Sequence, residues 1–180
     1  MKSNWKKIGI AIGVVTLLVI AGILMANSFT QEEPYKQVEL PFNNSVVNNS
    51  MPTYYDTALS IALDQAGLTG ITVVINPLSD QAKSQFDGEL KAHIRSFNGI
   101  YYLFIAELDR EDAIEVLSHE TIHLTQYQDG DISYDQNTGI VYWKGEEFNL
   151  ENVTYEKRPW EEDAFQKQGQ LIAGVTNILY

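Results

Sequence analysis

The chain has 180 residues, no cysteine and a formal net charge of −12 at pH 7. Its length suits one domain with some additional chain, and a hydrophobic fraction of 44% is too high for a disordered protein. Without cysteine there can be no disulfide and no thiolate metal ligand, and the excess of acidic residues argues against binding nucleic acid, because like charges repel.

The first 26 residues read as a membrane anchor. Residues 1–7, "MKSNWKK", carry three lysines and no acid, and residues 8–26 form an uninterrupted run of apolar or small residues. A helix of this length just spans the roughly 30 Å hydrocarbon core of a bilayer. Lysines before the span predict a cytoplasmic N-terminus and an extracytoplasmic remainder. A cleaved signal peptide is the alternative, but the run is long and Leu24 stands where a cleavage site needs a small residue.

Residues 27–52 are rich in Asn, Ser and Pro and lack periodicity, so we expect a flexible stalk. The folded domain is expected over residues 53–180. Nine basic residues and all 24 acidic residues follow the apolar run, which gives that part a formal charge of −15. This negative charge is explained by solubility, without an acidic docking role.

The expected domain alternates helices with short strands. Apolar spacing predicts a helix over residues 53–67, and β-branched residues predict a strand at 71–75. Residues 89–97 alternate as a half-exposed strand, and "NG" at 98–99 predicts a hairpin turn into a buried strand at 100–106. A helix follows from Asp109 to about residue 128, then a hairpin over 132–150 and a last helix over 159–179. This order predicts an α+β domain with a short antiparallel sheet packed on one central helix.

The helix expected from Asp109 contains the pattern H-E-x-x-H. His119 and His123 are one helical turn apart and project from the same face, where two imidazoles can share one Zn²⁺. Glu120 lies one step round the helix, where it can reach a water molecule on the metal. The alternative is a solvated helix whose histidines are incidental.

A catalytic zinc site needs a third protein ligand. Three acidic residues, Glu161, Glu162 and Asp163, begin the last helix, and any of them could reach the metal; alternatively, they only complement the helix dipole. His93 is a weaker candidate, because it lies on a strand face between Lys91 and Arg95 and reads as an exposed polar residue.

"HETIHLTQ" followed by "RPWEEDA" resembles the small bacterial and phage zincin-like metallopeptidases of gluzincin type. The resemblance covers about residues 103–168 and includes Gln126 and the pattern P-x-E-x-x-A, in which Pro159 and Ala164 flank Glu161. It implies Zn²⁺ ligands at His119, His123 and Glu161, with Glu120 as the general base.

The expected function is therefore a membrane-anchored, extracytoplasmic zinc metallopeptidase that hydrolyses peptide or protein substrates. A second donor is needed for the oxyanion, and Tyr155, Tyr127 and Arg158 are candidates. Two alternatives are a membrane-anchored binding module with a structural or vestigial zinc site, and a zinc hydrolase acting on cell-wall peptides. A closed site with Glu162 or Asp163 as a fourth ligand would mark the binding module.

The anchor makes a topological prediction. Full-length protein should stay with the membrane fraction, and protease added to intact cells or spheroplasts should remove the C-terminal domain. A soluble full-length chain or a protected C-terminus would contradict it.

Overall fold

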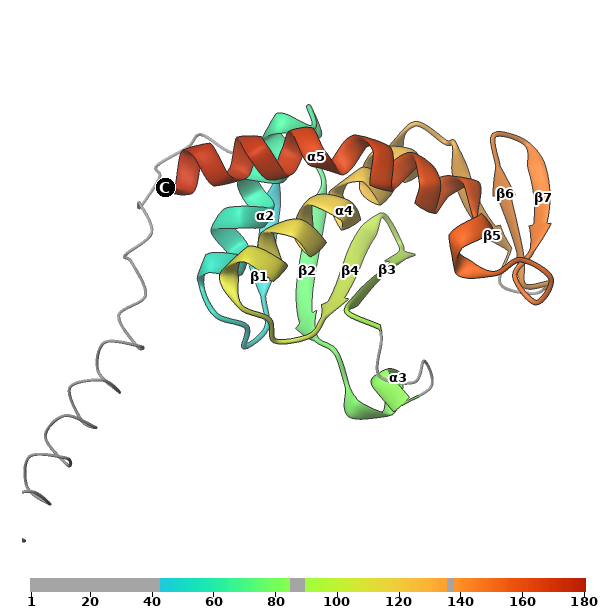
Figure 1. Cartoon of the computed structure of the whole chain (residues 1–180), viewed down its shortest axis with the longest axis horizontal. Helices are drawn as coiled ribbons and strands as arrows, with labels where there is room; N and C mark the ends of the chain where they lie inside the picture. Colours follow the sequence, from blue (N-terminus) through green and yellow to red (C-terminus); the bar gives the residue numbers. More distant parts are fainter. Residues whose placement is uncertain (1–42, 85–89, 136–137) are drawn as a thin grey trace, which may run out of the picture. The chain divides into compact units, whose positions relative to one another are not determined.

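The structure, a computed structural model, describes residues 43–84, 90–135 and 138–180. Within these ranges it contains four α-helices, one 3-10 helix and seven strands, which confirms the α+β class (Figure 1). In chain order the elements are β1 (Ser45–Asn48), α2 (Tyr54–Gln65), β2 (Thr72–Pro77), α3 (Asp80–Ser84), β3 (Ala92–Phe97), β4 (Ile100–Ile105), α4 (Arg110–Gln128), β5 (Ile132–Asp135), β6 (Ile140–Trp143), β7 (Glu146–Asn149), η1 (Tyr155–Lys157) and α5 (Pro159–Leu179).

The larger sheet is mixed, so the prediction of an antiparallel sheet was only partly right. Its strand order is β1-β2-β4-β3, and only the β3–β4 hairpin is antiparallel. β1 pairs with β2 and β2 pairs with β4 in parallel. The expected turn at Asn98-Gly99 joins β3 to β4, and both residues take positive φ there. β4 therefore lies between β2 and its own hairpin partner.

The first strand, β1, corrects the boundary expected between stalk and domain. Residues 45–48 were assigned to the stalk, but they pair with β2 over their whole length. The segment is short and its side chains alternate only between exposed and half-buried, so it lacks a strong strand pattern. With β1 in place, β1, α2 and β2 form a β-α-β unit, which accounts for the parallel pairing.

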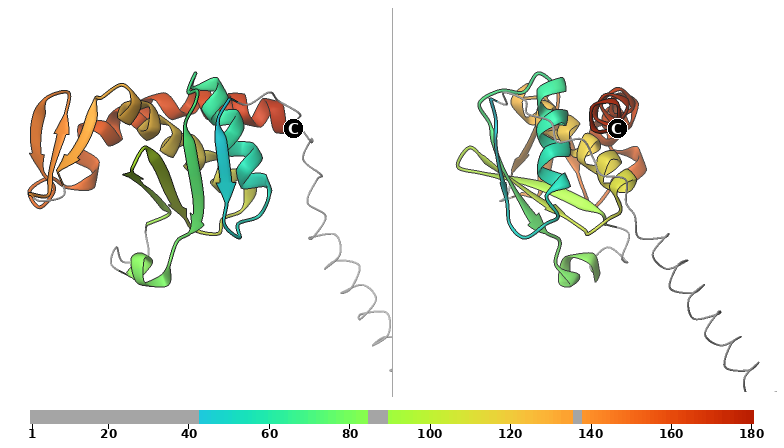
Figure 2. Two further views of the ribbon diagram at one scale, coloured as in Figure 1. Left: turned by 180° about the vertical axis from the view of Figure 1, so that it is seen from behind. Right: turned by 90° about the vertical axis from the view of Figure 1, so that its left-hand side faces the viewer.

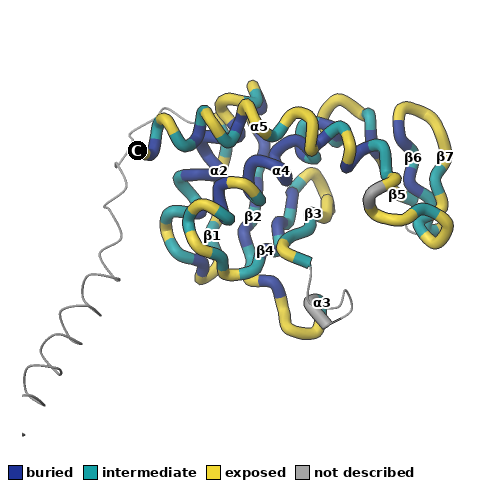
Figure 3. Tube along the Cα trace, viewed as in Figure 1, coloured by how far each residue is buried: buried dark blue, intermediate teal, exposed yellow. Residues whose placement is uncertain are grey.

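The main core lies between this sheet and the helices α2 and α4. Val73 and Ile75 on β2 and Leu103 on β4 are fully buried, and α4 packs against α2 and β3. Figure 2 shows both helices on the same side of the sheet, and Figure 3 shows buried residues running along α4. α5 packs against α2 and α4, so α4 is enclosed by other elements.

The second sheet is a three-stranded meander of β5, β6 and β7 rather than the predicted two-stranded hairpin. Its buried residues Ile132, Val141 and Trp143 form a cluster with Trp160 at the start of α5. This cluster holds the first turn of α5 against the region where α4 ends.

Among the described residues, no helix combines the length and the apolar character needed to cross a membrane. The apolar run at 8–26, the residues before it and the first part of the expected stalk lie outside the described ranges.

The contacts at the end of β1 lead to a prediction about stability. Asn48 at the end of β1 donates to Met51 O and to Asp56, and it accepts from Met51 N at 2.8 Å. Asn48→Ala should therefore lower the free energy of unfolding by about 1–3 kcal/mol in denaturant titrations. The neighbouring Asn49→Ala removes one exposed side-chain contact and should change it by less than about 0.5 kcal/mol. If Asn48→Ala changed the free energy of unfolding as little as Asn49→Ala does, the contacts at the end of β1 would contribute little to the fold.

Candidate metal centre

The local sequence explains why α4 forms and where it ends. The Asp109 side chain accepts a hydrogen bond from Asp112 N at 2.9 Å, as an N-cap residue does. At the other end Gly130 takes a φ of +74°, and Asp131 N donates to Gln126 O at 2.9 Å. The helix thus runs from Arg110 to Gln128, as the sequence predicts.

The middle of α4 buries polar side chains where an ordinary core helix would bury apolar ones. Ser118, His119, Glu120, Thr121 and Gln126 are all buried. Burying an ionisable group is costly unless hydrogen bonds, an opposite charge or a metal compensates for the loss of water. Compensating partners are therefore expected on the helix that covers this segment, α5.

α5 supplies an acidic partner, Glu161. Pro159 occupies the first turn of the helix, where its missing N–H has no cost. Glu161 follows one residue after the packed Trp160 and is itself buried, with 7% of its surface exposed. The cluster of Trp160 with the second sheet thus directs the Glu161 side chain toward α4.

Three potential ligand atoms converge between the two helices. Nε2 of His119 lies 3.1 Å from Glu161 Oε2 and 3.1 Å from Nε2 of His123, and Nε2 of His123 lies 3.2 Å from the same Glu161 oxygen. A tetrahedral zinc ion with bonds of about 2.0–2.1 Å separates its ligand atoms by roughly 3.3–3.4 Å. The three atoms therefore form one face of a tetrahedron of nearly the size that zinc requires, and this buried group could hold a metal ion.

Gln126 determines which nitrogen of His123 faces this site. Its amide nitrogen donates to Trp160 O at 3.0 Å and to Asp163 Oδ2 at 2.9 Å, so its oxygen must point the other way. That oxygen lies 2.8 Å from Nδ1 of His123 and can only accept. Nδ1 therefore carries the proton, and Nε2 of the neutral imidazole presents a lone pair to the site.

A second glutamine contacts the other imidazole, that of His119. The amide oxygen of Gln168, on α5, lies 2.7 Å from Nδ1 of His119. The Phe165 ring also packs against this imidazole, with the ring centroids 4.7 Å apart. With both Nδ1 atoms donating, two nitrogen lone pairs and one carboxylate oxygen face each other, and this arrangement requires a cation among them.

In the metal-free protein a proton supplies that positive charge. Burial alone would lower the pKa of His123, but the hydrogen bond to Glu161 and the charges of Glu120 and Glu161 raise it to about 9. Burial would likewise raise the pKa of Glu161, yet its close contacts with His119, His123 and Tyr155 hold it well below its ordinary value. The site is therefore built around an anionic Glu161.

Glu120 is buried on the same helix without being one of the three converging ligands. Burial raises its pKa, which His123 and His119 partly oppose and the charge of Glu161 reinforces. A carboxylate with a raised pKa beside a cationic centre suits a group that takes up and returns a proton.

Of the three proposed oxyanion donors, only Tyr155 contacts the converging group. Its hydroxyl donates to Glu161 Oε2 at 2.7 Å, and burial together with the Glu161 charge raises its pKa, so it stays protonated. Tyr127 packs instead on the cluster of the second sheet. The Arg158 guanidinium lies over the Tyr155 ring, 5.4 Å from its centroid.

The other candidate ligands lie apart from the converging atoms. Asp163 accepts from Gln126 and from Lys167 at 2.8 Å, while Glu162 is exposed and accepts from Gln166. The structure thus brings Glu161, rather than its neighbours, to the histidines. His93 was expected to be exposed but is half-buried on β3, because its ring stacks on Phe104, with centroids 4.9 Å apart.

Gln168 is the residue of the site that the sequence analysis missed. It lies seven residues after Glu161, two helical turns along the same face of α5, and this spacing was the available signal. Gln126 was noticed only through the resemblance, and its orienting role follows from its partners in the structure.

Comparison of the chain with protein-family models, with curated proteins and with solved structures finds no match. Function is therefore inferred from the site itself.

The raised pKa of His123 leads to a prediction about metal binding. At pH 7 the metal-free site holds a proton that zinc must displace, so binding should release about one proton and strengthen about tenfold per pH unit up to pH 9. Calorimetry in buffers with different ionisation enthalpies measures this release.

Two variants give the controls. His123→Ala should lose zinc, whereas His93→Ala, on the outer strand, should keep it. Zinc binding without proton release at pH 7 would show that the imidazole of His123 is already neutral.

Proposed function

We propose that the chain is a membrane-anchored zinc metallopeptidase whose domain acts outside the cytoplasm on peptide or protein substrates. The observation that carries the proposal is the triangle of Nε2 of His119, Nε2 of His123 and Oε2 of Glu161, with sides of 3.1–3.2 Å and a buried Glu120 beside it. Two imidazoles and one carboxylate are a ligand set of catalytic zinc sites, which keep a fourth position open.

The residues around the triangle have separate roles in the proposed reaction. A zinc ion there supplies Lewis-acid chemistry, making a water molecule acidic near neutral pH and polarising the scissile carbonyl. Glu120 accepts the proton of that water and returns it to the leaving amine. The Tyr155 hydroxyl stays protonated and would turn from Glu161 Oε2 to donate a hydrogen bond to the oxygen on which charge develops. Gln126 and Gln168 keep both imidazoles turned toward the metal.

The sheet offers a place for an extended substrate. β3 is an outer strand of the larger sheet, and α4 packs beside it. A peptide that pairs with such an edge gains main-chain hydrogen bonds, which provide affinity with little dependence on sequence. The predicted anchor over residues 8–26 restricts these substrates to the outer side of the membrane.

The structural-zinc alternative needs a fourth protein ligand. The sequence offered Glu162 and Asp163 for that place, but both have other partners in the described structure. This favours an open site and therefore catalysis. The cell-wall alternative concerns the substrate alone, and hydrolysis of casein compared with peptidoglycan separates it from a general peptidase.

Substitutions of three glutamates separate the proposed catalytic role from metal binding. Glu120→Gln keeps size and hydrogen bonding but removes the base, so zinc content should stay near normal while hydrolysis falls by about 10²–10⁴. Glu161→Gln removes an anionic ligand, so zinc binding should weaken first and excess metal should restore part of the activity.

Glu162→Gln is the matched control, because this side chain is exposed beside the ligand, and it should change neither property. Metal content measured with hydrolysis of a fluorogenic peptide gives both readouts. Full activity in Glu120→Gln would refute the zincin mechanism and favour the binding module.

A further inference from the structure

A surface pocket of about 410 Å³ lies beside the converging group. The residues that line it are Tyr155, Glu161, Glu162, Phe165 and Gln166. Glu161 belongs to the converging group, so the pocket lies beside that group. Its volume is in the range of about 300–1,000 Å³ that is usual for small-ligand sites.

Two exposed aromatic rings distinguish this pocket. Among the described residues, six large hydrophobic side chains are exposed, and two of them, Tyr155 at 45% and Phe165 at 54%, line it. Phe165 also packs on the imidazole of His119. An apolar group bound between the two rings would therefore lie next to the proposed reaction centre, and burying both rings is favourable.

We infer that this pocket binds an aromatic or large aliphatic side chain of the substrate residue next to the cleaved bond. The inference rests on the proposed function, because it needs the metal at the triangle. It defines the substrate class as peptides with a bulky apolar residue at the cleavage site.

The charges around the pocket favour an apolar rather than a basic side chain. The Arg158 guanidinium already lies over the Tyr155 ring and brings positive charge to that wall. Glu161 is committed to the two histidines. Glu162 remains as an acid at the rim, where it is exposed to solvent and accepts from Gln166 at 3.3 Å. An exposed charge of this kind attracts a cation only weakly.

Hydroxamates that bind zinc directly test the pocket without requiring hydrolysis. Full-length protein is loaded with zinc in detergent, the zinc content is measured, and dissociation constants are obtained for three probes. The probes are acetohydroxamate, phenylacetohydroxamate and a hydroxamate with an aminoalkyl arm. The phenyl probe should bind at least about tenfold more tightly than the methyl probe, because its ring is buried between Tyr155 and Phe165.

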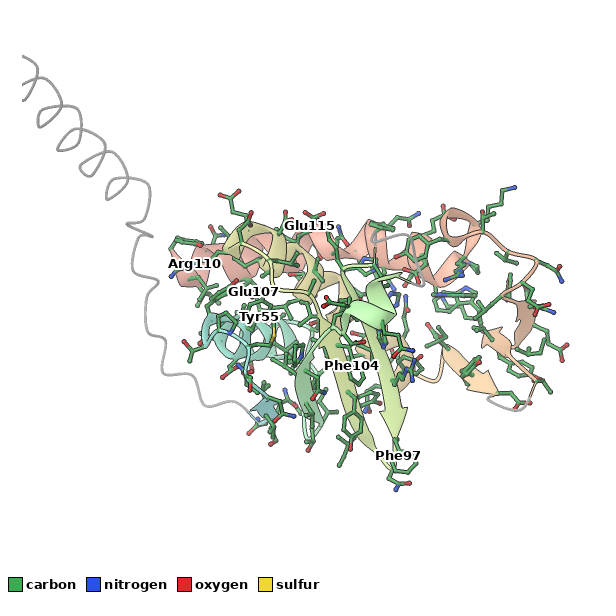
Figure 4. All side chains as sticks on the ribbon, turned by 90° about the horizontal axis from the view of Figure 1, so that it is seen from below. Tyr55, Phe97, Phe104, Glu107, Arg110 and Glu115 are labelled. Carbon is green, nitrogen blue, oxygen red and sulfur yellow. The ribbon has the colours of Figure 1, made fainter. Side chains whose placement is uncertain are left out.

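Phe165→Ala should reduce this ratio to near one while zinc content is unchanged, and Phe165→Leu should preserve part of it. Phe97→Ala is the control, because Phe97 is 63% exposed and lies at the end of β3, away from α4 and α5 (Figure 4). It should keep the full ratio.

The outcomes distinguish the pocket from the proposed function. A phenyl preference that depends on Phe165, in a protein that hydrolyses no peptide, supports the pocket and refutes the peptidase. Peptide hydrolysis with equal affinity for all probes, or tightest binding of the cationic probe, overturns the pocket and leaves the peptidase standing. Failure to load zinc overturns both.

Discussion

The structure depends on the close approach of three hydrogen-bond acceptors inside the protein. Two imidazole nitrogens and a carboxylate oxygen lie 3.1–3.2 Å apart between α4 and α5. Such an arrangement is unfavourable unless a cation lies among them, and in the metal-free protein a proton on His123 takes that place. A divalent ion would satisfy all three groups at once, which explains why a core helix buries residues that are rarely buried.

Holding this arrangement requires several distant parts of the fold. Gln126 connects α4 to the first turns of α5 through Trp160 and Asp163, and Gln168 connects α5 back to His119. The second sheet anchors Trp160, so it contributes to the position of Glu161 although it lies outside the main core. The larger sheet supports α4 from the opposite side. Both sheets and α5 therefore help to hold the same three atoms in place.

The sequence predicted those elements whose signals are local. The Asp109 cap, the His119 and His123 spacing and Pro159 each define a helix or a face through neighbouring residues, and the structure confirms α4 and α5. It failed where structure comes from long-range pairing. β1 has little pattern of its own and becomes a strand only because β2 lies beside it, so the parallel sheet was missed. The choice of Glu161 over its neighbours likewise depends on how Trp160 packs.

The central claim is that the three converging atoms bind one metal ion. X-ray diffraction from crystals of zinc-loaded protein, with data collected on both sides of the zinc absorption edge, tests it most directly. We expect a single anomalous peak about 2.0–2.2 Å from Nε2 of His119, Nε2 of His123 and Oε2 of Glu161, with no fourth protein ligand. A stoichiometric zinc ion bound elsewhere, or a fourth protein side chain on this ion, would contradict it.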